Sequence, residues 1–172
     1  GSYFAWGEIT TKNNYVWDTY KYGSSYDKLT KYGDVDIESS LSISASADSL
    51  VPLFPTLELN DDVAKAHYGG NWRMPTIVEI DELIKNCTWE WISMNGVNGY
   101  KVTSNLNGNK IFLPAAGYCE GKELSMVGSY GYYWSNSYGF YSSLLGTSTE
   151  CLFFRSNNVE PRSFRRYRGH SI

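Results

Sequence analysis

The sequence is poor in the residues that build metal and redox sites. Its 172 residues include two histidines, three cysteines and no glutamine. The cysteines, Cys87, Cys119 and Cys151, are far apart and form no C-x-x-C pair, so the ligand spacing of a zinc site is absent. We therefore expect neither a metal nor a cofactor. One disulfide between two of the three and a set of three free thiols are both compatible with this number.

Charge and long apolar runs are also scarce. Charged residues make up 19% of the chain, below the ~25% of an average domain, and the net charge is −3. This composition excludes a disordered chain and a wholly basic nucleic-acid binder. No apolar run approaches the ~18–20 residues of a membrane-spanning helix, so we expect no membrane insertion by this domain. The length suits a single domain over residues 1–172 with a substantial core.

The motifs of common catalytic sites are missing as well. Neither His67 nor His170 has a nucleophile motif such as G-x-S-x-G around it, and no phosphate-binding glycine motif is present. The acidic clusters at 61–62 and 79–82 could serve acid–base chemistry, but acids in the first turn of a helix usually stabilise its end. We interpret these clusters as helix starts and expect no enzymatic activity.

Aromatic residues are what the chain has in excess. They make up 16% of it, as 15 Tyr, 7 Phe and 6 Trp. A plain core would prefer Leu, Ile and Val, whereas each Tyr brings a hydroxyl that needs water or a hydrogen-bond partner. So many Tyr indicate either strands with a wet edge or a recognition surface.

Two helices are predicted in the middle of the chain. Asn60-Asp61-Asp62 predicts a short helix to about His67, stopped by Gly69-Gly70. Thr76-x-x-Glu79 after Pro75 is a capping box that starts a second helix. Its apolar stripe has three-to-four spacing and predicts that Cys87 is a small buried apolar group. The stripe consists of Ile77, Ile80, Leu83, Ile84 and Cys87.

Strands are predicted around these helices. Asn107-Gly108 lies between two alternating segments and predicts a hairpin. The expected strands are 3–9, 89–92, 100–103, 110–113, 132–135 and 149–155, with a turn at 156–158. Residues 10–33 are predicted to be loop, and the Ser- and Pro-rich 34–58 to be a surface insert. The pattern predicts an α+β fold with two helices, a largely antiparallel twisted sheet and long loops.

The carboxy-terminal part has the composition of a binding surface. Residues 129–143 contain five Tyr, five Ser and two Gly, as antibody loops do. A Tyr-rich strand and turn would have the same composition. Five of the six Arg, and none of the nine Lys, lie in 138–172, beside two Glu. Arg and Tyr are the usual anchors of interfaces, although a solvated basic face or an anion- or nucleic-acid-binding patch is an alternative.

Several motifs resemble one family. Gly69-Gly70-Asn71-Trp72-Arg73-Met74-Pro75-Thr76 is similar to the G-x-W-R-[ML]-P-T motif of the Fibrobacter succinogenes major paralogous domain, which is common in Bacteroides-type surface proteins. Further matches follow in order along the chain at Phe4-Ala5-Trp6-Gly7-Glu8, Leu113-Pro114-Ala115-Ala116-Gly117-Tyr118, Gly131-Tyr132-Tyr133-Trp134-Ser135 and Arg166-Tyr167-x-Gly169-x-Ser171-Ile172. The insert at 34–58 and the lack of an Arg-Pro-Val ending depart from the family pattern.

The resemblance implies a C-type-lectin-like fold, related to the formylglycine-generating enzymes. It also implies display on the cell surface, in an outer-membrane lipoprotein or a pilus-associated adhesin. The calcium-dependent sugar motifs Glu-Pro-Asn and Trp-Asn-Asp are missing, so lectin chemistry is not implied. The enzyme branch needs a close pair of cysteines, whereas each cysteine here is 32 residues from the next.

Some members of this family are variable proteins of diversity-generating retroelements, in which the adenines of template Asn codons are randomised. Residues 151–159 resemble such a template, with Leu152 and Phe154 retained and Cys151, Phe153 and Arg155 at randomised positions. The period of two then predicts that the latter three face solvent. Randomised Asn codons cannot give Lys, Met, Trp, Gln or Glu. Residues 138–172 contain none of the first four, although they do contain two Glu.

The resemblance therefore implies a non-enzymatic adhesin or ligand-binding module with a variable region at 138–172. Its partner would be a protein or another cell-surface ligand and not nucleic acid. A carbohydrate-binding domain of fixed specificity, a relative of the formylglycine-generating enzymes and a structural domain of a pilus or lipoprotein are the alternatives. The expected ligand-binding residues are Tyr138, Phe140, Tyr141, Ser142, Leu144, Leu145, Cys151, Phe153, Arg155, Arg162, Ser163, Phe164, Arg165, Arg168 and His170.

Overall fold

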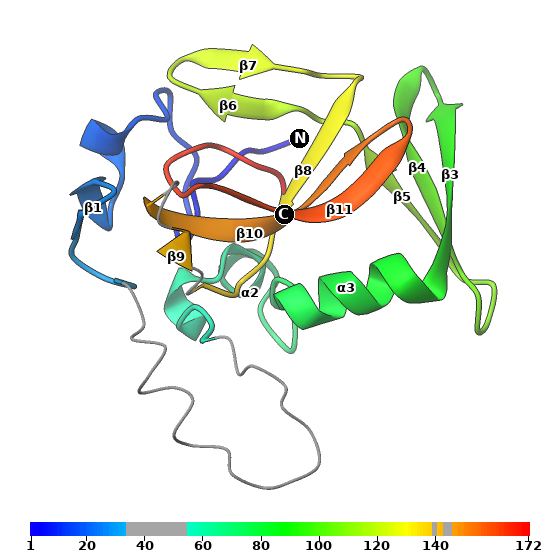
Figure 1. Cartoon of the computed structure of the whole chain (residues 1–172), viewed down its shortest axis with the longest axis horizontal. Coiled ribbons are helices and arrows are strands. Elements are labelled where there is room, and N and C mark those ends of the chain that lie inside the picture. Colours follow the sequence, from blue (N-terminus) through cyan, green and yellow to red (C-terminus); the bar gives the residue numbers. More distant parts are fainter. Residues whose placement is uncertain (34–54, 139–140, 143–145) are drawn as a thin grey trace, which may run out of the picture.

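The computed structural model describes residues 1–33, 55–138, 141–142 and 146–172. Within these ranges the chain is α+β, as predicted, with two α-helices and mostly antiparallel strands (Figure 1). Of the predicted insert at 34–58, residues 34–54 lie outside the described residues. No helix in the described part of the chain is long and apolar enough to cross a membrane.

The central sheet has the strand order β11-β10-β8. It consists of β8 (Tyr130–Trp134), β10 (Gly146–Arg155) and β11 (Asn158–Arg165), all antiparallel to their neighbours. A short strand, β9 (Tyr141–Ser142), pairs with the start of β10. The predicted strands at 132–135 and 149–155 and the turn after them are confirmed. β10 is the middle strand and pairs with both β8 and β11.

The predicted second helix and the hairpin are also confirmed. α3 (Ile77–Asn86) begins at Thr76, whose side chain accepts from the Glu79 amide in the predicted capping box. It leads directly into the antiparallel sheet β3 (Cys87–Met94), β4 (Val97–Ser104) and β5 (Lys110–Pro114), drawn in green in Figure 1. Cys87 is therefore not on the helix. It is the half-buried first residue of β3, because the chain becomes extended there.

The predicted first helix begins later than expected. A 3₁₀ turn, η2 (Leu59–Asp61), comes first, and the side chain of Asp62 then caps α2 (Val63–Tyr68) by accepting from the Lys65 amide.

The predicted strand at 3–9 is reduced to one bridge between Phe4 and His170. The predicted loop at 10–33 contains short elements, namely η1 (Trp17–Thr19), β1 (Gly23–Ser25) and β2 (Lys28–Leu29). A small hairpin, β6 (Tyr118–Glu120) and β7 (Glu123–Ser125), completes the described elements.

Two hydrophobic clusters cover opposite faces of the central sheet. One face carries Trp134, Cys151 and Phe153, which pack with aromatic residues of the first 32 positions and with Tyr167. The other face carries Leu152 and Phe154, which pack against α3 and against the sheet β3-β4-β5. The middle strand is consequently buried on both sides.

Most of the early tyrosines belong to the first cluster. Tyr15, Tyr20, Tyr22 and Tyr32 are buried, and each hydroxyl has a hydrogen-bond acceptor. Tyr15 and Tyr20 donate to the main-chain oxygens of Tyr3 and Trp6, whereas Tyr22 and Tyr32 donate to the Asp61 carboxylate. Much of the Tyr excess is therefore core, with the hydroxyls satisfied inside the protein.

Candidate ligand-binding face

The structure overturns the predicted exposure of the residues at alternate positions in β10. Cys151 is 0% exposed and Phe153 is 2% exposed, so neither side chain can touch a ligand at the surface. The reason is the cluster formed by the amino-terminal segment and Tyr167, which covers the face that the sequence predicts to be open. Only Arg155, at the end of the strand, remains exposed. Burial also raises the pKa of the Cys151 thiol well above its usual value.

His170 is likewise a core residue and not a surface residue. Its ring is fully buried and stacks on Trp134, with ring centroids 3.9 Å apart. Its backbone pairs with Phe4, which ties the two ends of the chain together. Burial, with a smaller contribution from the Arg168 charge, lowers the pKa of His170 well below its usual value. The imidazole is therefore neutral and structural.

The part of the predicted region before β10 is only partly described. Phe140, Leu144 and Leu145 lie outside the described residues, and Tyr141 and Ser142 are described only as strand β9. Tyr138 is half-buried and packs edge-to-face on Trp6 and Tyr32, with ring centroids 5.7 and 5.2 Å away. Tyr138 thus contributes to the core cluster and keeps part of its ring accessible.

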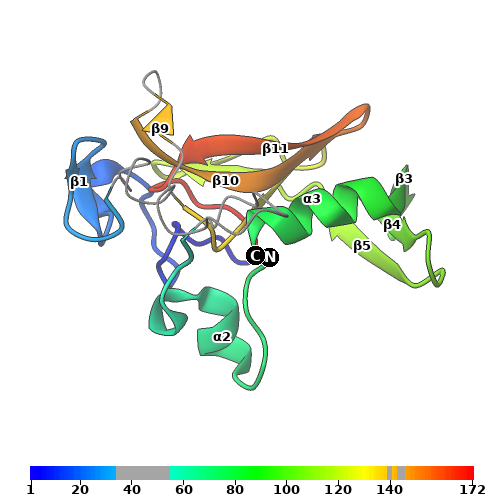
Figure 2. The same cartoon turned by 60° about the horizontal axis from the view of Figure 1, so that its bottom comes forward.

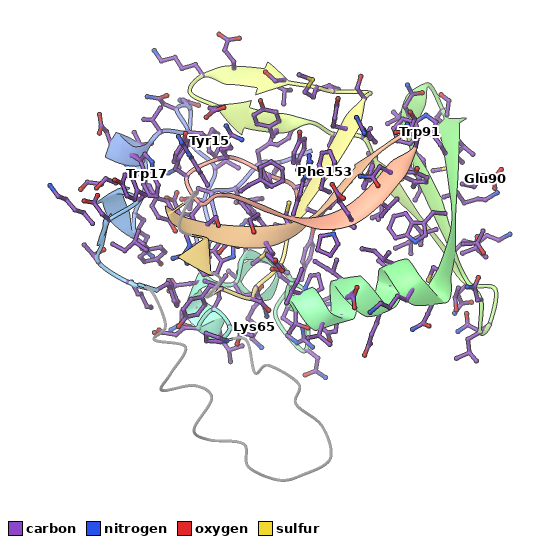
Figure 3. The ribbon with its side chains drawn as sticks, in the orientation of Figure 1. Tyr15, Trp17, Lys65, Glu90, Trp91 and Phe153 are labelled. Carbon is purple, nitrogen blue, oxygen red and sulfur yellow. The ribbon has the colours of Figure 1, made fainter. Side chains whose placement is uncertain are left out.

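Two further predicted residues, Arg162 and Phe164, pack against aromatic side chains of β8 and β10. Phe164 on β11 is half-buried and contacts Tyr132 and Phe153, with centroid distances of 5.1 and 6.1 Å. The guanidinium of Arg162 is exposed and lies 4.7 Å from the centre of the Phe153 ring, which it covers. Tyr130 extends this surface along β8, in tilted contact with Phe153 at 5.8 Å. Figure 3 labels Phe153 between the β10–β11 hairpin and the β6–β7 hairpin.

A second arginine closes the surface on the side of β6. The guanidinium of Arg168 lies 5.3 Å from the centre of the Tyr118 ring and donates to the Glu120 carboxylate at 2.8 and 2.9 Å. The Tyr167 hydroxyl donates to the same carboxylate. We call the surface made by Tyr118, Tyr130, Arg162, Phe164 and Arg168 the arginine–aromatic face. Its two guanidinium groups are held over rings and beside carboxylates, since Arg162 also pairs with Glu160 at 3.0 Å.

Other predicted residues point away from this face. The pairing of Glu150 with Ser163 and of Ser148 with Arg165 places Ser163 and Arg165 on the opposite side of the sheet from Arg162 and Phe164. Arg165 is exposed and Ser163 is half-buried. Ser163 therefore lies outside the arginine–aromatic face, whereas the Arg165 guanidinium donates to the Tyr167 hydroxyl at 3.5 Å and so lies at the border of that face.

Sequence reasoning missed two residues of the face and one residue that supports it. Tyr118 on β6 and Tyr130 on β8 belong to the face, and Glu120 on β6 accepts from the Arg168 guanidinium. They join it because Cys119 bridges to Gly169 and Tyr130 pairs with Arg155, which are contacts between distant segments. Only Tyr130 carried a local signal, since it lies in the Tyr- and Ser-rich segment 129–143. The four-residue apolar run Cys151 to Phe154 was itself a sign of burial on both faces.

The chemistry of this face is suited to recognition. Aromatic rings provide rigid contact area, and guanidinium groups provide donors for carboxylates or carbonyls.

All three cysteines are described, and each thiol is free. In the described ranges, no group of three His, Cys, Asp or Glu side chains is arranged to hold a metal ion. No protein-family model, curated protein or solved structure matches this chain.

Proposed function

We propose that this protein is a non-enzymatic ligand-binding domain of the C-type-lectin-like type, displayed on a bacterial cell surface. Its ligand would be a protein or another surface molecule bound at the arginine–aromatic face. The parent chain would be an outer-membrane lipoprotein or a pilus-associated adhesin. These features come from the resemblance of the sequence motifs to the Fibrobacter succinogenes major paralogous domain.

One observation carries the proposal. Phe164, Tyr118 and Tyr130 are half-buried on a surface where two guanidinium groups are fixed over aromatic rings. Arg and Tyr held in place by their neighbours lose little conformational freedom on binding, which is the property of interface anchors. The scaffold below them is buried on both sides and supports a fixed surface.

Burial narrows the set of positions that a retroelement could usefully vary. Arg162, Phe164 and Arg168 retain accessible surface, so a change at any of them alters the arginine–aromatic face. Arg155 and Arg165 are exposed but lie outside this face. Changes at Cys151, Phe153 or His170 would alter core packing instead. Under this proposal the useful variation lies in β11 and the segment after it.

The neighbouring DNA tests the diversification part of the proposal. We expect a reverse-transcriptase gene and a near-identical repeat of the sequence that encodes 138–172, with differences at adenines. The differing codons should include those of Arg162, Phe164 and Arg165. If no such repeat exists, the domain is not diversified in this way, and a fixed binding specificity takes its place.

An alanine pair tests the binding face itself. We expect Arg162→Ala with Phe164→Ala to weaken binding to any ligand found on an array of extracellular protein domains and glycans by about tenfold or more, as for interface anchors. Leu106→Ala is the matched control, because Leu106 is exposed in the β4–β5 loop, which contributes no residue to the face. If the double variant and Leu106→Ala lose affinity equally, or if the double variant loses none, the arginine–aromatic face is not the binding site.

A further inference from the structure

A second aromatic surface lies where α2 ends and the loop to α3 begins. Tyr68 is 68% exposed and Trp72 is 67% exposed, and their ring centroids are 6.0 Å apart with the planes tilted by 54°. All six tryptophans are described, and Trp72 alone is exposed. In Figure 2, α2 projects from the lower edge of the molecule, away from the β10–β11 sheet. The pair is therefore separate from the arginine–aromatic face.

The loop that carries this pair is fixed at its base. The buried carboxylate of Asp62 accepts from the Lys65 amide at 3.1 Å and from the Met74 amide at 2.9 Å, so one side chain joins the start of α2 to the end of the loop. Within the loop, the Trp72 amide donates to the Gly69 carbonyl. Gly69 and Gly70 both have positive φ, which turns the chain back and brings Trp72 beside Tyr68. We call the rings of Tyr68 and Trp72 the aromatic platform. Its geometry is thus fixed before any ligand binds.

Charges near the pair are already engaged. Arg73 makes two hydrogen bonds to the Glu79 carboxylate, at 2.6 and 2.7 Å, and the Lys65 ammonium donates to the Gly70 carbonyl. The exposed side-chain amide of Asn71 lies between Gly70 and Trp72 in the sequence and offers both a donor and an acceptor. Two flat apolar faces beside a neutral amide favour a ligand that is uncharged, rich in hydroxyls and has one apolar face.

A cavity adjoins the platform. Its volume is about 460 Å³, within the ~300–1,000 Å³ of small-molecule sites, and Tyr68 and His67 form part of its lining. Phe4, Phe112 and Tyr133 supply aromatic walls. Tyr68 is therefore shared between the platform and the cavity, so one extended ligand can contact both.

From these contacts we propose that Tyr68 and Trp72 bind a neutral oligosaccharide. The apolar face of one pyranose ring stacks on Trp72, and the next unit passes Tyr68 towards the cavity. The Asn71 amide hydrogen-bonds to ring hydroxyls. This site is independent of the proposed ligand at the arginine–aromatic face.

Soluble neutral oligosaccharides provide the test. We would titrate the protein with gluco-, xylo- and manno-hexaose and follow tryptophan fluorescence and its quenching by acrylamide. Binding should shield Trp72 from acrylamide, since Trp72 is the exposed tryptophan. Trp72→Ala and Tyr68→Ala should each weaken binding by about tenfold or more, whereas Trp72→Phe should retain part of it because a ring face remains.

A control variant separates the possible outcomes. Leu106→Ala should leave saccharide affinity unchanged, because Leu106 lies in the β4–β5 loop, outside this site. If no saccharide binds, or if binding survives both alanine substitutions, the proposal is wrong. If sedimentation instead shows self-association that is lost in Trp72→Ala, the platform binds a second copy of this chain, and the saccharide proposal is overturned.

Discussion

His170 is a titratable side chain whose environment differs from the one that its sequence position suggests. Two residues from the last residue of the sequence, it is nevertheless fully buried among Trp134, Tyr132 and Phe164. Its lowered pKa means that the folded protein binds a proton there less readily than the unfolded chain does. One buried side chain thus couples folding to pH.

The coupling has a definite direction. In the unfolded chain the pKa of a histidine is about 6.5. Above this pH, His170 is neutral in both the folded and the unfolded state, so protonation does not change the free energy of unfolding. As pH falls below that value the unfolded state gains a proton and the folded state does not, so stability decreases by up to about 1.4 kcal/mol per pH unit. We expect urea unfolding at about pH 7.5 and pH 5.5 to show this loss.

A substitution isolates the effect of this histidine. His170→Phe keeps an aromatic ring against Trp134 and removes the titration, so its stability should vary less with pH over the same interval. The lowered pKa of Glu79, held at about 2 by hydrogen bonds from Arg73, matters only under more acidic conditions. If His170→Phe retained the full dependence of the free energy of unfolding on pH, another titratable group would be its cause.

At the scale of elements, the central sheet depends on a glycine. Gly131 on β8 pairs with Phe154 on β10, and the Phe154 ring lies directly over the glycine Cα. A Cβ at this position would overlap the ring. Phe154 is fully buried between β8, α3 and the tryptophans of β3, so the ring has little room to move.

Gly131→Ala should therefore destabilise the fold. We expect a loss of about 1–3 kcal/mol in the free energy of unfolding from overpacking, measured by denaturant titration. Gly108→Ala is not a matched control, because Gly108 has positive φ and a Cβ would be strained there. Val78→Ala on the exposed side of α3 is a suitable one, and it should change stability by less than about 0.5 kcal/mol.

At the scale of the whole molecule, Asp61 joins segments that are distant in sequence. Its buried carboxylate accepts from the hydroxyls of Tyr22 and Tyr32, at 2.5 and 2.6 Å, and from Lys31 at 2.7 Å. Burial opposes its ionisation, but hydrogen bonds from Lys31, Tyr22 and Tyr32 outweigh it and hold the pKa well below the usual range. Three donors from the segment 22–32 thereby fix η2 against the first core cluster.

Asp61→Asn should loosen this junction. An amide cannot accept at both positions, so at least one buried donor loses its partner, at a cost of about 2–4 kcal/mol. Asp27→Asn is the matched control, because Asp27 is exposed and its side chain accepts from the nearby Ser25 hydroxyl. Similar thermal unfolding of the two variants would mean that the Asp61 network contributes little to stability.

Features that depend on neighbouring residues were predictable from the sequence. They include the capping box at Thr76, the Asn107-Gly108 hairpin, and β8 and β10 of the central sheet, whereas β11 was not among the predicted strands. The acids at 61–62 were correctly placed near a helix start, although only Asp62 caps the helix. In addition, the buried Asp61 accepts hydrogen bonds from tyrosines 29 and 39 positions earlier, about which its local context says nothing.

Contacts between distant segments determine which surfaces are open. Alternation along β10 distinguishes its two faces but does not say how many of them are covered, and here packing from both ends of the chain covers the second one. This packing buries Cys151, Phe153 and His170 and leaves Arg162, Phe164 and Arg168 accessible. The fold also places Tyr68 beside Trp72, because the Asp62 carboxylate closes a loop across 12 positions. Burial and the proximity of side chains depend on contacts between residues that are far apart in the sequence, and a local sequence pattern does not contain those contacts.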